Sequence, residues 1–474
     1  MIDRRSFALG SLATIAHGAA AGLPRVRAAT SGAPHSLDLH AAPRRARLLG
    51  PAGPDSEVWS YSGKLLDVMR VQQGTRIRAT LRNDLPQHTT VHWHGVRVPN
   101  EMDGVQYITQ PPVQPGEAFA YEFTPPDSGT FFFHPHCNES GQSGRGLLGV
   151  LIVEGDEVEA PDHEVVLIAK DWRLNTDGTY LPFVAKASAG KAGTFGTIRT
   201  VNGQARVRKE IPAGADLRIR ILNLDSTRVM ELGVEGGPAA IIATDGNPLP
   251  PIPLDTWRLG PAMRLDLLVR TPPAGGTLRI VDYFASEPFV LAELEAAGAA
   301  RRVKPFVAVP LRRANTPEAD VRTAERQTYT FGPASEALAD FSVEFDRDDP
   351  LRDAILDSLC VGSQTFWAIN KRPWPTGDMR RIPPPLAKLV EGRHYVFTLQ
   401  NATPHAHPIH LHGHTFKVVS SSRSKVPPHH ADTVLVAPKE RLDIAFVARR
   451  GKWMFHCHIL DHQESGMMGY FEIA

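Results

Sequence analysis

Gly392-Arg-His-Tyr-Val-Phe-Thr-Leu-Gln-Asn401 alternates apolar and polar residues in the manner of a half-buried β-strand. The same pattern occurs earlier in the chain, at residues 74–83 and 214–223. A second alternating pattern, which begins with proline, follows each copy at residues 115–123, 261–269 and 438–446. Two patterns in the same order in each third of the chain predict three copies of one β-domain.

Length and composition agree with this repeat. A chain of 474 residues has room for about three domains, and its 39 glycines and 40 prolines separate many short strand-like runs. Charged and polar links near residues 154–162 and 312–325 predict domains at residues 36–158, 160–312 and 325–474. The 52 basic and 51 acidic residues leave a net charge of +1, which favours neither a nucleic-acid partner nor an anionic membrane surface.

The N-terminus carries Arg4 and Arg5 ahead of a short, alanine-rich apolar stretch. This arrangement resembles a twin-arginine (Tat) export signal, which we place at residues 1–29. The resemblance predicts that the Tat machinery exports the protein to the periplasm or out of the cell. No later run offers about 18 uninterrupted apolar residues, so no membrane span is expected in the mature protein.

The three cysteines are too few for a disulfide scaffold. Cys457 lies among histidines and is interpreted as a metal thiolate. Cys137 and Cys360 remain, either as one disulfide in an oxidising compartment or as two buried thiols, and the sequence does not choose between these.

Histidine pairs spaced two residues apart occur in the first and third copies. The two copies are offset by 318 residues, and this offset places His92 and His94 on His410 and His412. The four pairs are His92/His94, His134/His136, His410/His412 and His456/His458. The i, i+2 spacing puts both imidazoles of a pair on one face of a strand. Eight imidazoles on two related domains predict a metal cluster between them. In the middle copy Met230 and Leu232 occupy the equivalent positions, so that domain is expected to hold no metal.

The last histidine cluster is Phe455-His456-Cys457-His458-Ile459-Leu460-Asp461-His462, followed by Met467. Two histidines, one cysteine and a weak axial methionine are the ligand set of a blue copper electron-transfer centre. Because side chains alternate along a strand, Cys457 should point away from the face that carries His456 and His458. One strand would then connect two metal sites through covalent bonds.

From about residue 40 to its C-terminus the chain resembles the three-domain multicopper oxidases of the laccase type. The resemblance implies an all-β fold of three cupredoxin-like Greek-key β-sandwiches and four copper ions per chain, one of type 1, one of type 2 and two of type 3. Carried onto matching positions, it implies the following ligands: His407, Cys457, His462 and axial Met467 for type 1; His92 and His410 for type 2; His94, His134 and His458 for one type 3 ion; His136, His412 and His456 for the other.

The resemblance also implies oxidation of phenols, aromatic amines or similar small electron donors, coupled to reduction of O2 to water. Electrons are expected to enter near His462, the usual exposed edge of a type 1 site. Asp103 matches the acid beside the trinuclear site and is expected to relay protons. Bacterial relatives commonly carry glutamate where this chain has Gln463, so either Glu464 or a chain of water molecules takes over that role or turnover is slower.

Three other functions compete with this one. A cuprous-ion oxidase of copper tolerance commonly carries a methionine-rich insert, whereas this chain has nine methionines and none between residues 313 and 366. A non-catalytic cupredoxin scaffold of the cell envelope would have lost ligands, and this chain keeps them all. A copper nitrite reductase needs no paired type 3 ions. His88, His405, His429 and His430 are expected to be solvated, and Trp93 and Trp453 to lie in the core.

Overall fold

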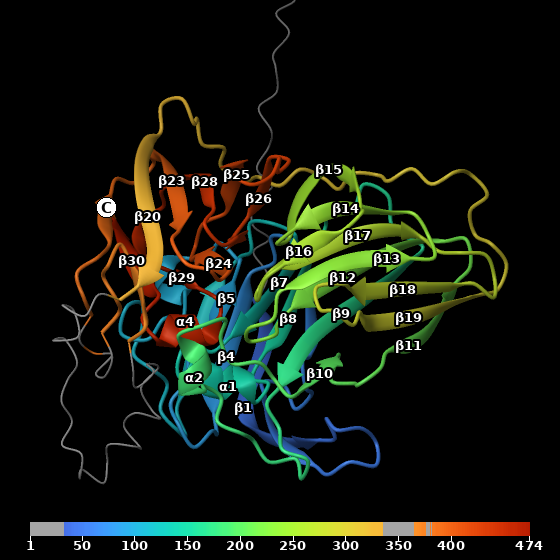
Figure 1. Ribbon diagram of the computed structural model, residues 1–474, viewed down its shortest axis with the longest axis horizontal. Coiled ribbons are helices and arrows are strands. Elements are labelled where there is room, and N and C mark those ends of the chain that lie inside the picture. Colours follow the sequence, from blue (N-terminus) through green and yellow to red (C-terminus); the bar gives the residue numbers. More distant parts are fainter. Residues whose placement is uncertain (1–32, 335–364, 376–379, 381) are drawn as a thin grey trace, which may run out of the picture. The chain divides into compact units, whose positions relative to one another are not determined.

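The two repeated patterns form neighbouring antiparallel strands in each third of the chain, as predicted. The pairs are β4 (Ile77–Asn83) with β6 (Ala118–Phe123), β12 (Asp216–Asn223) with β17 (Arg264–Arg270), and β23 (His394–Asn401) with β28 (Arg441–Val447). They are seen in a computed structural model that describes residues 33–334, 365–375, 380 and 382–474 (Figure 1).

Six sheets build three sandwiches, here called the first, middle and last sandwich. The first has the sheets β2-β1-β4-β6 and β3-β8-β7-β5; the middle has β10-β9-β12-β17-β14-β15 and β11-β19-β18-β13-β16; the last has β21-β20-β23-β28-β25-β26 and β22-β30-β29-β24-β27. Strands of the first are β1 (His35–Ala46), β2 (Ser56–Ser60), β3 (Val68–Gln72), β5 (His92–His94), β7 (Gly129–His134) and β8 (Gly149–Glu154).

The remaining strands follow in chain order. Those of the middle sandwich are β9 (His163–Trp172), β10 (Ile198–Val201), β11 (Arg208–Pro212), β13 (Met230–Glu235), β14 (Ala239–Thr244), β15 (Asn247–Pro253), β16 (Trp257–Leu259), β18 (Thr277–Asp282) and β19 (Phe289–Ala297). Those of the last are β20 (Glu325–Pro333), β21 (Trp367–Ile369), β22 (Ala387–Leu389), β24 (His407–Leu411), β25 (Phe416–Ser421), β26 (His429–Ala431), β27 (Thr433–Val436), β29 (Gly451–Cys457) and β30 (Met468–Ile473).

Short helices connect some of these strands. They are η1 (Asn100–Met102), α1 (Glu139–Gly144), α2 (Lys186–Ala189) and α4 (Leu460–Glu464). Helices α1 and α4 each follow a histidine-bearing strand, β7 and β29 respectively, and they contact each other. Among the residues that the structure describes, no helix combines the length and apolarity needed to cross a membrane.

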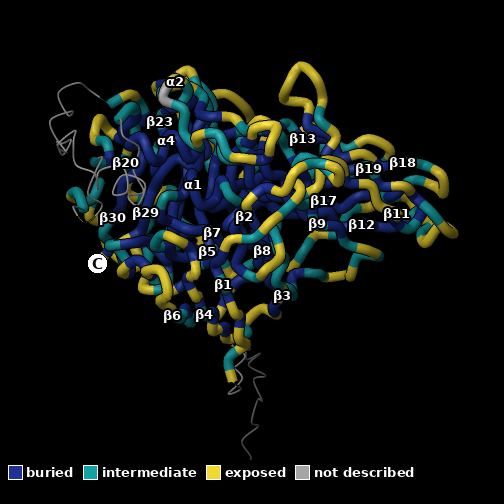
Figure 2. The backbone as a smooth tube through the Cα atoms, turned by 90° about the horizontal axis from the view of Figure 1, so that it is seen from below, coloured by how far each residue is buried: buried dark blue, intermediate teal, exposed yellow. Residues whose placement is uncertain are grey.

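Each sandwich has its own apolar core, and further apolar clusters join the sandwiches. Phe132 and Ile152 of the first pack with Trp172 and Leu222 of the middle, and a smaller cluster sets Cys137 among side chains of the last. The backbone is therefore buried along the contacts between sandwiches and exposed mainly at outlying turns (Figure 2).

This architecture confirms the all-β fold of three cupredoxin-like Greek-key sandwiches. Trp93 and Trp453 lie in the core, as expected. Met230 and Leu232 lie in the core of the middle sandwich. The domain limits 36–158, 160–312 and 325–474 stay predictions. Residues 1–29, with the expected export signal, and Cys360, with its possible bond to Cys137, lie outside the described residues.

Candidate metal centre

The eight paired histidines meet between the first and last sandwiches. Strand β5 pairs with β7 so that His92 lies opposite His134, and β24 pairs with β29 so that His410 lies opposite His456. Between sandwiches, ring centroids of His92 and His412 are 3.8 Å apart, and those of His94 and His410 are 3.7 Å apart. The predicted convergence of the two outer thirds is thus present in the structure.

Most of these imidazoles direct a nitrogen without a hydrogen-bond partner into the shared space. Among the eight paired histidines, the buried nitrogens without a hydrogen-bond partner are Nε2 of His92, His134, His136, His410 and His458, and Nδ1 of His94. An unpartnered buried polar atom costs free energy, and native structures keep few of them unless an ion or water completes the site. The cluster therefore fits metal ions.

Burial also favours the neutral form of several of these imidazoles, which is the form that binds metals. Loss of solvation lowers the pKa of His136 to about 3 and that of His456 to about 4. The same cause, reinforced by neighbouring imidazoles, lowers the pKa of His410 and His412 well below the ordinary value. At neutral pH their lone pairs are available without loss of a proton.

Several groups of three histidines lie close enough to share a metal ion, and one of these groups is a set expected from the sequence. Ligand atoms of His136, His412 and His456 all lie within 4.8 Å of one another. In the second expected set, the ring centroids of His94 and His134 lie 5.0 Å and 5.1 Å from that of His458. Both expected sets of three draw on histidines of the first and the last sandwich.

Backbone carbonyls fix the orientation of several imidazoles. The Nδ1–H of His92 donates to the carbonyl of Asp103 at 2.8 Å, that of His410 to the carbonyl of Asp432 at 2.8 Å, and that of His456 to the carbonyl of Cys457 at 3.0 Å. A hydrogen bond from one ring nitrogen sets the tautomer and presents the other nitrogen to a metal.

Asp103 is fully buried beside histidines of both outer sandwiches. Its Oδ2 accepts a hydrogen bond from His412 Nδ1 at 2.8 Å, and its Oδ1 lies 3.3 Å from His92 Nδ1. The turn that brings it there needs glycine: Gly104 has a φ of +78°, and a Cβ atom would lie 1.8 Å from the Val91 carbonyl oxygen. The proton-relay role of Asp103 stays a prediction, but the residue occupies the position that the role requires.

Cys457 points to the opposite face of β29 and meets two further histidines. Its Sγ lies 3.6 Å from Nδ1 of both His407 and His462, and these two nitrogens are 3.0 Å apart. Three soft or borderline donor atoms facing one another in this way fit one metal ion. Burial raises the pKa of the Cys457 thiol, so an ionised sulfur there requires a cation beside it.

Met467 belongs to the same buried apolar cluster as Cys457. Its N–H donates to the His462 carbonyl at 2.9 Å, and its carbonyl accepts from Cys457 N at 3.0 Å. The backbone thus holds Met467 between two residues of the sulfur site. Its role as axial ligand stays a prediction.

The expectation that His462 forms an exposed edge is wrong. His462 is fully buried, and its Nε2–H donates to the carbonyl of Lys191 at 2.8 Å. Trp367 lies against the same ring at a centroid distance of 4.7 Å and donates its Nε1–H to Ala189 at 2.7 Å. The chain at and after α2, in the middle sandwich, covers the histidine that was expected to face solvent.

A buried acid that the sequence analysis missed contacts the cluster from α1. Glu139 places Oε1 2.9 Å from His134 Nδ1, and its Oε2 accepts a hydrogen bond from Gln463 Nε2 at 3.0 Å. Burial opposes its ionisation, but His134 and the imidazoles next to it outweigh burial and hold the pKa of Glu139 well below its usual range. Gln463 is therefore hydrogen-bonded to a carboxylate of the facing helix.

Glu464, the predicted substitute for that carboxylate, faces α1 rather than a histidine. Its two oxygens accept hydrogen bonds from Ser140 N at 2.8 Å and Ser140 Oγ at 2.6 Å. Burial raises the pKa of Glu464 to about 7, although the Ser140 hydrogen bonds oppose this shift. Its catalytic role stays a prediction. The only sequence signal for Glu139 was its position three residues after His136.

Replacing Glu139 with glutamine should lower the free energy of unfolding by about 1–3 kcal/mol, because a charge-assisted hydrogen bond to a buried imidazole becomes a neutral one. Urea unfolding of the copper-loaded protein measures this change. Ser143→Ala in the same helix is the matched control, since it removes a buried hydroxyl that has no hydrogen-bond partner among the described residues. Equal stability of the glutamine variant and the parent would contradict the assigned contact.

A buried ion pair links all three sandwiches beneath the cluster. Arg264, in β17 of the middle sandwich, donates to Asp432 of the last at 2.9 Å and 2.5 Å. Asp432 Oδ1 in turn accepts from His94 Nε2 of the first sandwich at 3.0 Å. The middle sandwich, which holds none of the expected ligands, therefore supplies the cation that orients a histidine of the site.

Two other histidines have structural contacts. His414 donates from Nδ1 to the His412 carbonyl at 2.8 Å and accepts at Nε2 from Arg449 N at 3.0 Å, so it stays outside the ligand set. His429 is buried rather than solvated, because it packs against Trp257 with ring centroids 5.7 Å apart.

Three cupredoxin-like sandwiches that share a histidine cluster between the outer two define the multicopper oxidases, and this chain belongs to that family. Sequence profiles described as "Multicopper oxidase" match residues 46–158 and 352–474. Members of the family are copper-dependent oxidoreductases that use O2 as the electron acceptor, which confirms the enzyme class predicted from the sequence.

Individual relatives cover nearly the whole chain. The crystal structure of a multicopper oxidase from Pseudomonas thermotolerans has 36% identity and a TM-score of 0.82, and covers 94% of this chain and 100% of its own. Multicopper oxidase MmcO of Mycobacterium tuberculosis is 28% identical over 97% of this chain and 93% of its own length. A laccase of Cryphonectria parasitica is 26% identical over 89% of this chain and 79% of its own length.

Proposed function

We propose that the protein is a laccase-like oxidase that removes single electrons from phenols, aromatic amines or similar donors and passes them to O2. The observation that carries this proposal is the position of Cys457, which faces His407 and His462 while its neighbours His456 and His458 face the histidine cluster. Bound copper would supply the one-electron acceptor at the sulfur site and the site of O2 reduction at the cluster.

We assign the ligands as the family resemblance implies, which gives four copper ions. Type 1 takes His407, Cys457, His462 and axial Met467; type 2 takes His92 and His410; one type 3 ion takes His94, His134 and His458, and the other takes His136, His412 and His456. Cys457 is bonded through the backbone to a ligand of each type 3 ion, which provides a short covalent path between the two sites.

The reaction balances when phenol is the donor. Each phenol loses one electron and its hydroxyl proton and becomes a phenoxyl radical. Four phenols and one O2 give four radicals and two water molecules, so the protons released match those consumed. Inside the protein, we assign proton delivery to the cluster to Asp103, which contacts His412, and to Glu464 on α4.

An organic donor fits the chain better than cuprous ion, the second candidate. The Cryphonectria relative is named a laccase, and of the nine methionines none lies between residues 313 and 366, where a soft-ligand insert would be expected. A non-catalytic envelope scaffold fits less well, because no ligand of the family pattern is missing.

Copper loading and oxygen uptake test the proposal together. Protein loaded with copper should contain about four ions per chain and show the blue colour of a copper–thiolate bond. It should consume O2 faster with a methoxyphenol than with Cu(I) at the same concentration. Uptake with Cu(I) alone would favour the cuprous-ion oxidase, and a blue protein that takes up no O2 with either donor would contradict both oxidases.

A further inference from the structure

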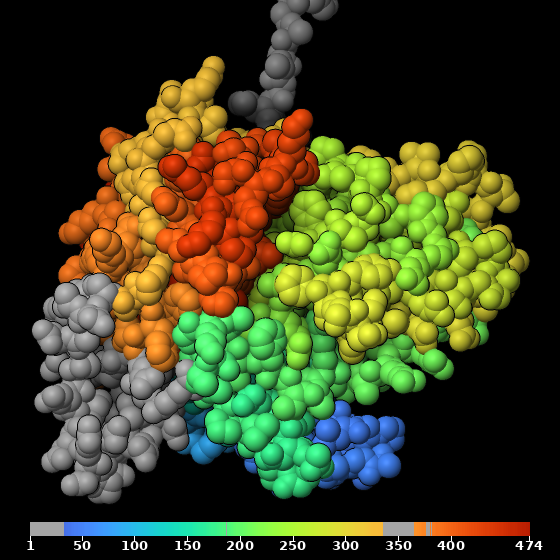
Figure 3. Space-filling view, viewed as in Figure 1, coloured from blue at the N-terminus to red at the C-terminus, as the bar shows by residue number. Residues whose placement is uncertain are grey.

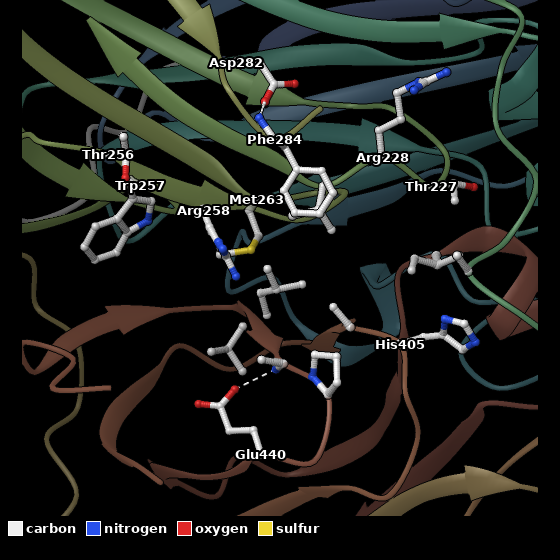
Figure 4. Close-up of a pocket in the computed structure, with 18 of the residues that line it drawn as sticks. Thr227, Arg228, Thr256, Trp257, Arg258, Met263, Asp282, Phe284, His405 and Glu440 are labelled. Carbon is white, nitrogen blue, oxygen red and sulfur yellow. Dashed lines mark hydrogen bonds between the residues drawn. The ribbon is translucent and has the colours of Figure 1, made fainter. Parts of the chain in front are cut away.

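A large cavity lies between the middle and last sandwiches, which meet face to face in Figure 3 as the green-to-yellow and orange-to-red parts of the molecule. Its volume is about 1120 Å³, and side chains of both sandwiches point into it (Figure 4). Sites for small molecules commonly measure about 300–1,000 Å³, so an aromatic donor with a side chain fits easily.

The cavity reaches the sulfur site through one peptide group. Ala192 lines the cavity, and the carbonyl of the preceding residue, Lys191, accepts the hydrogen bond from His462 Nε2 at 2.8 Å. Ala406 and Ile459, which lie next to His407 and His458 in the chain, also line the cavity. An electron released in the cavity therefore has a path of one hydrogen bond and one peptide group to His462, although that histidine is itself covered.

The middle-sandwich wall carries aromatic rings that arginines stack against. Arg228 lies 5.1 Å from the centroid of Phe195, Arg199 lies 5.0 Å from Phe289, and Arg258 lies 6.0 Å from Phe284. Phe284 is 52% exposed and projects toward the centre of the cavity (Figure 4). Such a wall offers flat apolar surface for a ring and guanidinium groups beside it.

The charges of the lining favour an anion. Five arginine or lysine side chains and three carboxylates line the cavity, but Arg199, Arg228 and Arg258 already lie within 3.9 Å of carboxylates of the protein. Two of the three lining carboxylates are also bonded within the protein. Asp282 accepts from Arg199 at 2.7 Å, and Glu440 accepts from Ala437 N at 2.6 Å. On the last-sandwich wall Arg423 and Lys425 are exposed, and neither forms an ion pair with a carboxylate of the described chain.

The same lining offers little to a soft cation. Met263 is the single methionine among the described lining residues, and its sulfur accepts a hydrogen bond from Gly260 N at 3.1 Å. His429 donates its Nδ1–H to the Pro427 carbonyl at 2.8 Å. Cuprous ion prefers several thioether, thiolate or imidazole ligands together. The described lining has one thioether and two imidazoles, those of His405 and His429, and hydrogen bonds already engage Met263 and His429.

We infer that this cavity is the electron-donor site and that it selects phenols bearing a carboxylate or sulfonate, with the ring on the Phe284 wall and the anionic group near Arg423 and Lys425. The inference rests on the proposed laccase-like function and specifies its substrate class. Each bound phenol gives up one electron, through the Ala192–Lys191 peptide group and His462, together with its hydroxyl proton, as in the balanced reaction above.

Binding of a donor that cannot react tests the site apart from the chemistry. Calorimetric titration of the copper-loaded enzyme with 3-(3,4-dimethoxyphenyl)propanoate, which has no phenolic hydroxyl, should show binding. The double variant Arg423→Gln/Lys425→Gln should weaken it about fivefold, as expected of two solvent-exposed charge interactions. Phe284→Ala should weaken it about threefold or more. Lys209→Gln, an exposed change in β11 outside the cavity, is the matched control and should leave it unchanged.

Measurements of O2 uptake then distinguish the proposed donor site from the laccase-like function on which it rests. With 3-(4-hydroxy-3-methoxyphenyl)propanoate and its methyl ester, whose saturated linker keeps the phenols electronically alike, kcat/KM should favour the acid. The double variant and added salt should both reduce that preference. If both phenols are oxidised equally by parent and double variant, or if the dimethoxy acid does not bind, the donor site is wrong while the laccase-like function stands. If neither phenol supports O2 uptake, the function itself fails.

Discussion

Replacing Cys457 with serine should abolish both the blue colour and the oxidation of phenols, while the protein stays folded. The hydroxyl is close in size to the thiol, so the buried site keeps its packing, but a neutral hydroxyl is a poor ligand for a copper ion that a thiolate binds well. Copper content should fall from about four ions to about three per chain, because the histidine cluster on the opposite face keeps its ligands. Metal analysis, visible absorption and O2 uptake measure the three effects.

Cys137→Ser is the matched control, since Cys137 is buried as deeply as Cys457 but lies in a separate apolar cluster. That variant should keep the blue colour. Retained phenol oxidation in the Cys457 variant would overturn the electron path from the sulfur site to the cluster. Loss of all copper would show instead that the two sites do not form independently.

The strand pairs and the meeting of the histidines could be predicted because their signals are local and repeated. Alternation along residues 74–83 and 392–401 reports burial of one face, and i, i+2 spacing in pairs such as His92/His94 reports which side chains share a face. The constant difference in residue number between the first and third copies then implies that histidine pairs of the first copy have equivalents in the third. These regularities need no knowledge of how the sandwiches are oriented.

The contacts that complete the site could not be predicted in this way. Gln463 meets Glu139 across 324 residues, His462 meets Lys191 across 271, and Arg264 meets Asp432 across 168. Each joins residues of two different sandwiches, so each depends on how those sandwiches are placed, and no periodicity in one segment encodes that placement. The expectation that His462 is exposed was wrong for this reason. Its own segment matches the family, but the segment that covers it belongs to the middle sandwich.

The largest loss of stability is expected from Arg264→Met, because that change leaves a carboxylate buried without its cation. Arg264 and Asp432 are both fully buried, and Asp245 is close to both. Burial raises the pKa of Asp245 to about 7, and the neighbouring Asp432 adds to this shift, although Arg264 opposes it. Two carboxylates therefore already share the one positive charge of Arg264. Removing one partner of a buried ion pair costs about 3–5 kcal/mol.

The same substitution should also lower copper content, since Asp432 would no longer be held where it accepts from His94 Nε2. Urea unfolding and metal analysis measure the two effects. Arg279→Met in β18, whose side chain is 48% exposed, is the control and should change neither. The double variant Arg264→Met/Asp432→Asn should recover part of the lost stability, because it removes the unpaired charge, but not all of the copper. If Arg264→Met unfolds at the same urea concentration as the parent, the ion pair does not hold the three sandwiches together. If the double variant is no more stable than the single one, the cost does not come from the unpaired carboxylate.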